Sequence, residues 1–259
     1  MCGRFSLIAT REEVEAFIAA IIEAEFPPRY NIAPTQPIMM VVAGETQPEG
    51  SNLPDRKSIL VRWGFIPSWV KDPNSWPLMI NMRSETAVQK NSFRIAMNHF
   101  RGLVPASGFY EWRKVDKNKR QAYWIRPRKG GVVAFGALME TWSGADGSQV
   151  DTGGLLTTKA NKALAPIHDR MPVVIKPEDF SRWLDCKHYL PHEVEDLMQP
   201  VEDDFFEAIP VSDKVNHVAN ITPDIQERVE EDLAPQKSEP KRKKKTDNGD
   251  DSGGQLSMF

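Results

Sequence analysis

The stretch from Arg101 to Met139, RGLVPASGFYEWRKVDKNKRQAYWIRPRKGGVVAFGALM, contains three segments rich in Val, Ile, Leu and aromatic residues. These segments cover residues 101–112, 121–126 and 131–139, and their composition is typical of β-strands. Short polar stretches separate them, whereas a helical crossover between parallel strands needs about a dozen residues or more. Neighbouring strands in this stretch are therefore expected to pair antiparallel.

Strand and helix signals on both sides extend this pattern. Further strand-like segments lie at residues 37–43, 58–65, 153–158 and 171–175. Thr10 and Glu13 form a capping-box pattern, and apolar residues at helical spacing follow it as far as Ile22. Two more helices are predicted at about residues 84–99 and 177–184. Because closely spaced strands outnumber the helices, the sequence predicts an α+β fold.

Composition excludes several broad classes of protein. The 259-residue chain has 33 Lys and Arg against 36 Asp and Glu, so its net charge of −3 gives no support to a nucleic-acid partner. No apolar run approaches the roughly 18 residues that a membrane helix needs, and the N-terminus lacks the apolar stretch of a signal peptide. Two cysteines cannot form a disulfide framework. We expect a cytoplasmic protein without a membrane partner.

The composition changes near residue 230. From Ala234 to Gly254 no aliphatic side chain is larger than alanine, apart from the prolines. Such a segment buries too little apolar surface to offset the entropy that is lost on ordering. The sequence therefore predicts a folded domain at residues 1–230 and a disordered tail at residues 231–259. The basic run 241–245 in this tail is a solvated segment, a nuclear signal or a tether for nucleic acid.

Cys2 has the most distinctive chemistry in the chain. A small residue after the initiator Met allows that Met to be removed, which leaves the cysteine with a free α-amine beside its thiol. The reference pKa of such an amine is about 7.7–8.0, against about 10.4 for lysine, so more of it is neutral and nucleophilic at neutral pH. An aldehyde captured by the amine as an imine can then be closed by the thiol into a five-membered thiazolidine. Cys186 has only an amide nitrogen and cannot react in this way.

Polar residues recur in several other strand-like or turn-like motifs. These are RYNIAP at residues 29–34, WGFIPSW at 63–69, INMRSET at 80–86, GFYEW at 108–112 and IHDRMP at 167–172. Together with MCGRF at residues 1–5, they closely resemble the SOS-response-associated peptidase (SRAP) family, whose members shield abasic sites in single-stranded DNA by covalent crosslinking. The resemblance covers about residues 1–220 and implies a single SRAP-type domain with a mainly antiparallel, barrel-like core.

The resemblance implies four catalytic residues. Cys2 is the crosslinking residue after loss of Met1, and Asn81 holds the cysteine and the sugar by hydrogen bonds. Glu111 acts as acid and base around the imine, and its aromatic neighbours are expected to raise its pKa by desolvation. His168 assists opening of the abasic sugar and proton transfer. The imine also permits strand cleavage by β-elimination, a lyase activity, whereas peptidase activity is expected mainly in the self-removal of Met1.

A second set of residues is implied to bind DNA. Arg4, Arg83 and Arg170 match family positions that contact backbone phosphates, for which guanidinium groups are well suited. Trp69 matches a position on which bases stack, an interaction worth roughly 1–3 kcal/mol per base. Many members of the family have a second tryptophan beside it. In this chain Val70 stands there, which predicts a weaker stacking platform.

Structural roles are the alternative for several of these residues. A buried amide must be satisfied, so Asn31 is better explained by a structural hydrogen bond. Glu111 is alternatively a salt-bridged strand residue, and His168 a turn histidine. No cofactor is expected, and no metal at residues 186–192, because Pro191 interrupts any helix that would align the two histidines there. Other tryptophans are expected in the core or at its rim: Trp63, Trp112, Trp124, Trp142 and Trp183.

The end of the chain carries a separate signal. Gln255, Leu256, Met258 and Phe259 belong to the peptide QLSMF, which resembles peptides that dock on the bacterial replication sliding clamp. In that mode leucine and phenylalanine fill an apolar pocket. We expect a monomeric bacterial protein near the nucleoid and replication forks, with abasic single-stranded DNA and the clamp as its partners.

Two other classes of function remain open. An N-terminal-nucleophile hydrolase or glutamine amidotransferase can also begin Met-Cys-Gly, with the Cys2 thiolate attacking an amide and the α-amine as base. The sequence Arg4-Phe5 and the lack of a recognisable glutamine-binding set disfavour that class. A non-covalent adaptor for single-stranded DNA and the clamp requires no chemistry at Cys2. Replacing Cys2 with alanine distinguishes this adaptor, which keeps its function, from a crosslinking protein.

Overall fold

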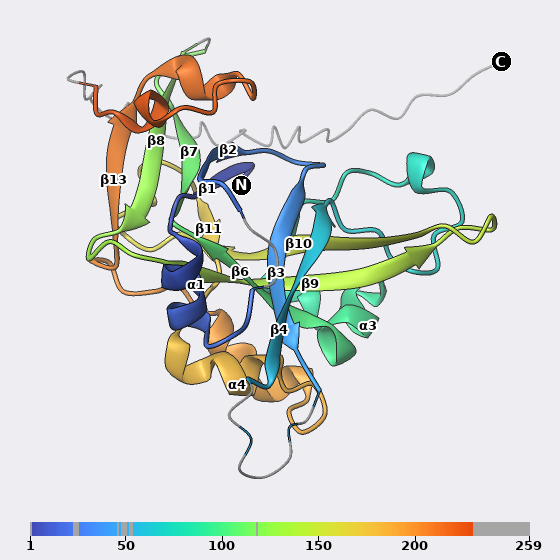
Figure 1. Cartoon of the computed structure of the whole chain (residues 1–259). Coiled ribbons are helices and arrows are strands. Elements are labelled where there is room, and N and C mark those ends of the chain that lie inside the picture. Colours follow the sequence, from blue (N-terminus) through green and yellow to red (C-terminus); the bar gives the residue numbers. More distant parts are fainter. Residues whose placement is uncertain are drawn as a thin grey trace, which may run out of the picture.

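Two β-sheets with helices along their edges form the fold, in a computed structural model that describes residues 2–22, 26–45, 47, 51, 54–117 and 119–229 (Figure 1). The tail predicted at residues 231–259, with its basic run and terminal peptide, lies outside these residues. Within the described ranges, every helix is too short or too polar to cross a bilayer.

The larger sheet contains a closed barrel. Its strands are β3 (Pro37–Ala43), β4 (Arg56–Trp63), β6 (Arg101–Ala106), β9 (Val133–Ser143) and β10 (Gln149–Lys159). β4 pairs with β3, β3 with β6, β6 with β9 and β9 with β10, all antiparallel. A parallel pairing of β10 with β4 closes the ring. This arrangement confirms the predicted α+β fold with a mainly antiparallel, barrel-like core.

Short strands attached to the barrel carry two of the sequence motifs. β5 (Asn81–Arg83) pairs parallel with β10, with Asn81 opposite Leu155. β11 (Arg170–Pro172) pairs antiparallel with the end of β10, and β12 (Val174–Ile175) pairs with β9. Strand β10 thus brings the motifs at residues 80–86 and 167–172 next to each other, although they are distant in the sequence.

The second sheet has the strand order β13-β8-β7-β1-β2. Its strands are β1 (Arg4–Leu7), β2 (Arg29–Ile32), β7 (Gly108–Lys114), β8 (Arg120–Pro127) and β13 (Phe206–Val211). The segment 101–112, predicted as one strand, is divided at Ser107 between this sheet and the barrel. The backbone N–H of Ser107 donates to the carbonyl of Ser6 at 2.7 Å, and its hydroxyl accepts from the N–H of Ile8 at 2.9 Å. These contacts hold the chain where it crosses from β6 to β7.

Helices are few and short, as expected. They are α1 (Arg11–Ile18), α2 (Ser84–Ala87), α3 (Asn91–His99) and α4 (Phe180–Leu184), and 3₁₀ turns lie at Pro73–Ser75, Pro177–Asp179, Pro191–Glu193, Glu195–Met198, Asp213–Asn216 and Pro223–Gln226. Helix α1 has the predicted capping box but ends earlier than predicted, because Ala19 adopts a left-handed conformation with φ of 52°. The helix predicted at residues 84–99 is divided into α2 and α3.

The tryptophans expected in the core or at its rim lie there. Trp63 and Trp183 are completely buried and Trp124 is buried, whereas Trp112 and Trp142 are partly exposed. Each indole N–H donates to a protein acceptor: Ile80 O, Gly102 O, Ser6 Oγ, Asn216 Oδ1 and Val70 O, respectively for Trp63, Trp183, Trp124, Trp112 and Trp142. These rings therefore have structural roles. Trp69 is the remaining predicted residue whose ring could stack on a base.

Candidate active site

Cys2 lies at the entry to β1, next to the barrel. Its side chain is completely buried. The amide Nδ2 of Asn81 donates a 2.7 Å hydrogen bond to the carbonyl of Cys2, which links the N-terminal segment to β5. Burial raises the pKa of the Cys2 thiol well above its ordinary value, and the nearby carboxylate of Glu111 raises it further. The thiol is therefore protonated at neutral pH.

Asn81 owes its orientation to the alternation of side chains along β5. Met82 is buried in the main core, so Asn81 and Arg83 point from the opposite face of the strand. The Oδ1 atom of Asn81 is buried and has no hydrogen-bond partner among the described residues. An amide whose nitrogen is fixed and whose oxygen is unpaired is prepared to accept a hydrogen bond from a bound group.

Glu111 reaches the same region from β7. Phe109, on the same face of this strand, packs in the main core, whereas Tyr110 and Trp112 pack against a separate apolar cluster on the other face. Glu111 is only 3% exposed. Burial raises the pKa of its carboxyl above the ordinary value, while nearby His168 opposes this shift. A carboxyl whose pKa is raised in this way is better suited to give and accept protons during a reaction.

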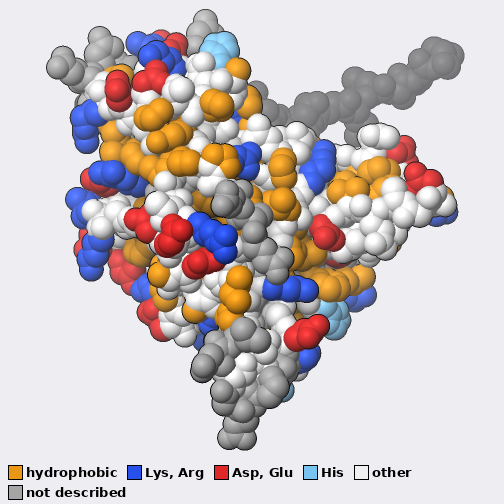
Figure 2. Space-filling model, viewed as in Figure 1, with side chains coloured by type: hydrophobic (Ala, Val, Ile, Leu, Met, Phe, Trp, Pro, Cys, Tyr) orange, Lys and Arg blue, Asp and Glu red, His pale blue; other side chains and the backbone are white. Residues whose placement is uncertain are grey.

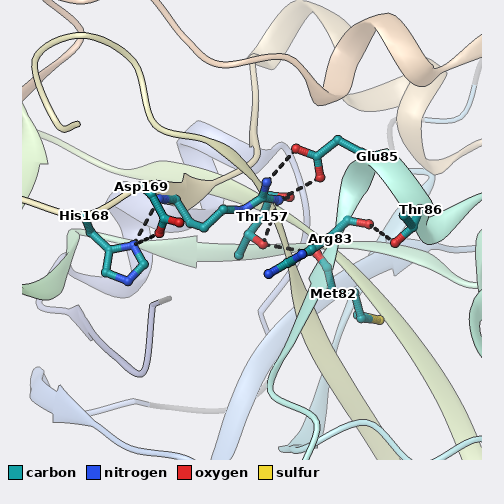
Figure 3. Close-up of polar contacts among 8 residues, drawn as sticks. Met82, Arg83, Glu85, Thr86, Thr157, His168 and Asp169 are labelled. Atoms are coloured by element: carbon teal, nitrogen blue, oxygen red, sulfur yellow. Dashed lines mark hydrogen bonds and ion pairs between the residues drawn. The ribbon is translucent and has the colours of Figure 1, made fainter. Parts of the chain in front are cut away.

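His168 ends the loop between β10 and β11. Its backbone N–H donates to the carbonyl of Leu164 at 3.0 Å. The ring Nδ1 accepts a 3.0 Å hydrogen bond from the backbone N–H of Arg170 and also lies 3.0 Å from the carboxylate of Asp169 (Figure 3). Because the Arg170 N–H can only donate, Nδ1 is the acceptor and the neutral ring carries its proton on Nε2. The His168 ring interacts electrostatically with the carboxyl of Glu111, which in turn lies near the Cys2 thiol.

The predicted phosphate-binding arginines differ in their availability. Arg83 is exposed. The guanidinium of Arg4 donates to Asn31 Oδ1 at 2.9 Å and to the carbonyl of Val215 at 2.8 Å. The guanidinium of Arg170 is buried and paired with both carboxylate oxygens of Glu85, at 2.6 and 2.8 Å. In this structure only Arg83 presents a free face to a phosphate, and the phosphate contacts of Arg4 and Arg170 stay predictions.

Trp69 is 56% exposed on the loop after β4. Strands β9 and β10 hold this loop: Thr152 Oγ1 accepts from the backbone N–H of Ile66 at 2.9 Å, and Glu140 Oε2 from that of Ser68 at 2.5 Å. The ring of Trp76 packs edge-on against Trp69, with centroids 5.3 Å apart. The neighbouring residue 70 is a buried valine, so no second tryptophan stands directly after Trp69 in the sequence.

The comparison with known families agrees with these motifs. A family model described as SOS response associated peptidase (SRAP) matches residues 1–218. The chain belongs to this family. Abasic site processing protein YoqW of Bacillus subtilis is 36% identical over 228 residues, which cover 87% of this chain and 98% of that protein. Abasic site processing protein YedK of Escherichia coli is 33% identical over 190 residues, which cover 71% of this chain and 79% of that protein.

Solved structures show the same fold. A crystal structure of a protein from Bacteroides thetaiotaomicron superposes with a TM-score of 0.75 and covers 88% of this chain and 100% of its own, at 21% sequence identity. A second, from Bordetella bronchiseptica, has a TM-score of 0.68 at 22% identity and covers 82% of this chain. At these identities the similarity concerns the fold alone.

Several residues around the SRAP site were missed by the sequence analysis. Glu85, within the motif INMRSET, pairs with Arg170, and Glu140 fixes the Trp69 loop. Asn31 has the structural role expected for it: its Nδ2 donates to the carbonyls of Val215, His217 and Asn220. Of these two glutamates, only Glu85 lies inside one of the motifs given above, so only Glu85 could have been identified from the sequence. No cluster of three or more His, Cys, Asp or Glu suited to a metal occurs in the described residues.

Proposed function

We propose that this SRAP protein acts on abasic sites in single-stranded DNA and captures them covalently through Cys2, after loss of Met1. The names of the relatives YoqW and YedK support the substrate class. The observation that carries the proposal is the convergence of Cys2, Asn81, Glu111 and His168 from separate elements, with the Asn81 amide bonded to Cys2 at 2.7 Å.

The proposed chemistry begins with the Cys2 amine. The neutral amine attacks the aldehyde carbon of the ring-opened sugar, and loss of one water gives an imine. The thiol then adds across the C=N bond: sulfur bonds to carbon, and the thiol proton ends on nitrogen. The product is a thiazolidine, and no oxidant is consumed.

Two residues are positioned for the proton transfers. Glu111, with its raised pKa, can protonate the departing hydroxyl as water leaves and accept a proton during ring closure. The Nε2–H of His168 is the donor expected to assist opening of the sugar ring. The unpaired Oδ1 of Asn81 accepts a hydrogen bond from the bound sugar or the amine. A lyase reaction by β-elimination from the imine is part of the same proposal.

DNA binding is proposed to centre on Arg83 and Trp69, which are exposed. Arg83 lies two residues from Asn81 on the same face of β5, so a phosphate bound there places the lesion near the site. Arg4 and Arg170 contribute by holding their neighbours and reach phosphate only if they exchange the protein partners they now have.

Mass spectrometry of the protein mixed with abasic single-stranded DNA tests the proposal. We expect an adduct, with the loss of one water, that maps to Cys2 as the first mature residue and survives denaturation. Cys2→Ala should lose this stable adduct, whereas Cys186→Ala, at the other cysteine, should keep it. An unmodified protein after long incubation, or an active protein that retains Met1, contradicts the proposal.

A further inference from the structure

A continuous chain of contacts leads from Glu85 to the His168 ring. Glu85, on helix α2, binds both terminal nitrogens of the Arg170 guanidinium at 2.6 and 2.8 Å. The same guanidinium donates to the carbonyl of Thr157 on β10. The backbone N–H of Arg170 donates to Nδ1 of His168 at 3.0 Å (Figure 3). Glu85 thus fixes the residue whose backbone orients the histidine.

Two groups compete for Nδ1 of His168, and each favours a different proton arrangement. The Arg170 N–H requires Nδ1 to be an acceptor, which leaves the proton of the neutral ring on Nε2. The carboxylate of Asp169, also 3.0 Å away, requires a proton on Nδ1. Asp169 is largely exposed, whereas Arg170 is buried and tied to two elements. The position of Arg170 therefore decides which proton arrangement the ring adopts.

We propose that Glu85 is a positioning residue that acts through Arg170 to keep the neutral His168 ring in its Nε2–H form. The pairing of Glu85 with Arg170 joins α2, which directly follows β5 and its Asn81, to β11 and the His168 loop. The strand that carries Asn81 and the loop that carries His168 are thereby held in a fixed relative position. The inference rests on the proposed function, because it assigns a catalytic value to the Nε2–H donor.

The opposite role for Glu85 makes a different prediction. In this alternative, the Glu85 carboxylate competes with a DNA phosphate for the guanidinium of Arg170. Removing the charge of Glu85 would then free Arg170 and strengthen DNA binding. A positioning role requires that removal slows the chemical step and leaves the affinity for DNA unchanged. The two roles therefore differ in both the rate and the affinity that are measured.

The kinetic test compares Glu85→Gln with the wild type on abasic single-stranded DNA. We expect the maximal crosslinking rate at saturating DNA to fall about tenfold, part of the 10²–10⁴ that general acid–base catalysis contributes. The Kd for DNA with a stable tetrahydrofuran abasic analogue should change less than about twofold. Glu207→Gln is the matched control, because it removes the carboxylate of another Arg–Glu pair, with Arg126 at 2.7 Å. Faster crosslinking or tighter binding by Glu85→Gln overturns the proposal.

An NMR measurement tests the inference without DNA. Imidazole ¹⁵N shifts distinguish the two neutral tautomers, and His168→Asn assigns the signal among the five histidines. We expect the Nε2–H form in the wild type and in Glu207→Gln, and a shift toward protonation at Nδ1 in Glu85→Gln. Asp169→Asn in the Glu85→Gln background should restore the Nε2–H form and the rate, because the competing carboxylate is gone. An unchanged tautomer in Glu85→Gln refutes the inference even if the wild type crosslinks DNA, whereas a wild type that does not crosslink refutes the proposed function alone.

Discussion

At the scale of single residues, burial and partners give chemically identical carboxyls different tasks. Glu111 is buried, and desolvation raises its pKa. Glu85 is partly exposed, and its hydrogen bonds with Arg170 lower its pKa. A carboxyl whose pKa is raised can exchange protons during a reaction, whereas one whose pKa is lowered remains a fixed charge. The two glutamates are therefore suited to acid–base chemistry and to positioning, respectively.

Glu111→Gln should slow crosslinking and change how stability depends on pH. Because the folded-state pKa of Glu111 is raised above the ordinary 4.5, its contribution to stability is full below that value and is lost as the pH rises through the raised pKa. Glutamine removes this loss, so the stability of the variant relative to the wild type should increase between about pH 4 and about pH 7. Urea unfolding at both pH values measures it.

The same variant should crosslink roughly 10²–10⁴ times more slowly, the usual contribution of a general acid–base residue. Parallel stability curves for the wild type and Glu111→Gln would show that burial does not shift this carboxyl.

Trp69→Ala should weaken binding of single-stranded DNA without destabilising the fold. Loss of one stacked base costs roughly 1–3 kcal/mol, and an exposed side chain contributes about 0.5 kcal/mol or less to stability. Fluorescence anisotropy at fixed salt measures the Kd, and thermal unfolding measures the fold. Tyr189→Ala, another exposed aromatic side chain, is the control and should bind DNA as the wild type does. Equal affinities of the two variants would remove Trp69 from the DNA path.

At the scale of elements, one buried arginine joins β6 to two helix ends. The Arg101 side chain donates to the carbonyls of Met97 at 2.8 Å and Trp183 at 2.6 Å, and also to those of Asp185 and Tyr189. A cation is favourable there because helix C-termini carry partial negative charge. Sequence reasoning placed Arg101 in a strand but gave no signal for this role, since its acceptors are all backbone carbonyls.

Arg101→Met should lower the free energy of unfolding by about 3–5 kcal/mol, because it leaves buried carbonyls without donors. Chemical denaturation measures this loss. Arg101 lies outside the proposed catalytic set, so the crosslinking rate per folded molecule should match that of the wild type. A variant as stable as the wild type would mean that water replaces the guanidinium.

Two elements end earlier in the structure than the sequence pattern predicts. Apolar residues continue at helical spacing to Ile22, yet Ala19 turns the chain out of the helix, and Ile21 pairs with Lys57 instead. Likewise, segment 101–112 has strand composition throughout but serves two sheets. Ile22 stays buried beyond the end of the helix, whereas Ile21 is 48% exposed, so apolar periodicity does not show where the chain leaves the helix.

At the scale of the whole molecule, side chains of opposite charge are interspersed, and the candidate site is built from elements that are far apart in the sequence. On the face in Figure 2, Lys and Arg side chains are interspersed with Asp and Glu, in keeping with the net charge of −3. The proposed DNA binding therefore relies on local contacts such as Arg83. The candidate site itself is assembled by strand order: the segment before β1, the strands β5 and β7, and the loop after β10 each supply one catalytic candidate.

Removal of residues 255–259 should abolish binding to the bacterial sliding clamp and leave DNA crosslinking unchanged. Leu256 and Phe259 are the proposed anchors, and burying such side chains is worth roughly 1.5–3 kcal/mol each. Surface plasmon resonance on immobilised clamp measures the first effect, and a denaturing gel of the DNA adduct measures the second. A scrambled terminal peptide of the same composition is the control. Loss of both activities contradicts a modular tail.

The sequence by itself determined the class of fold and was enough to predict the chemistry. A cysteine behind the initiator Met, the motifs with Asn81, Glu111 and His168, and closely spaced strands are all local features, readable because reactivity and strand propensity depend on nearby residues. Only the tertiary structure decided which arginines face outward and which are bound, and that Glu85 lies against Arg170. Those outcomes depend on pairings between strands and helices far apart in the chain, whose register is set by burial of the whole core.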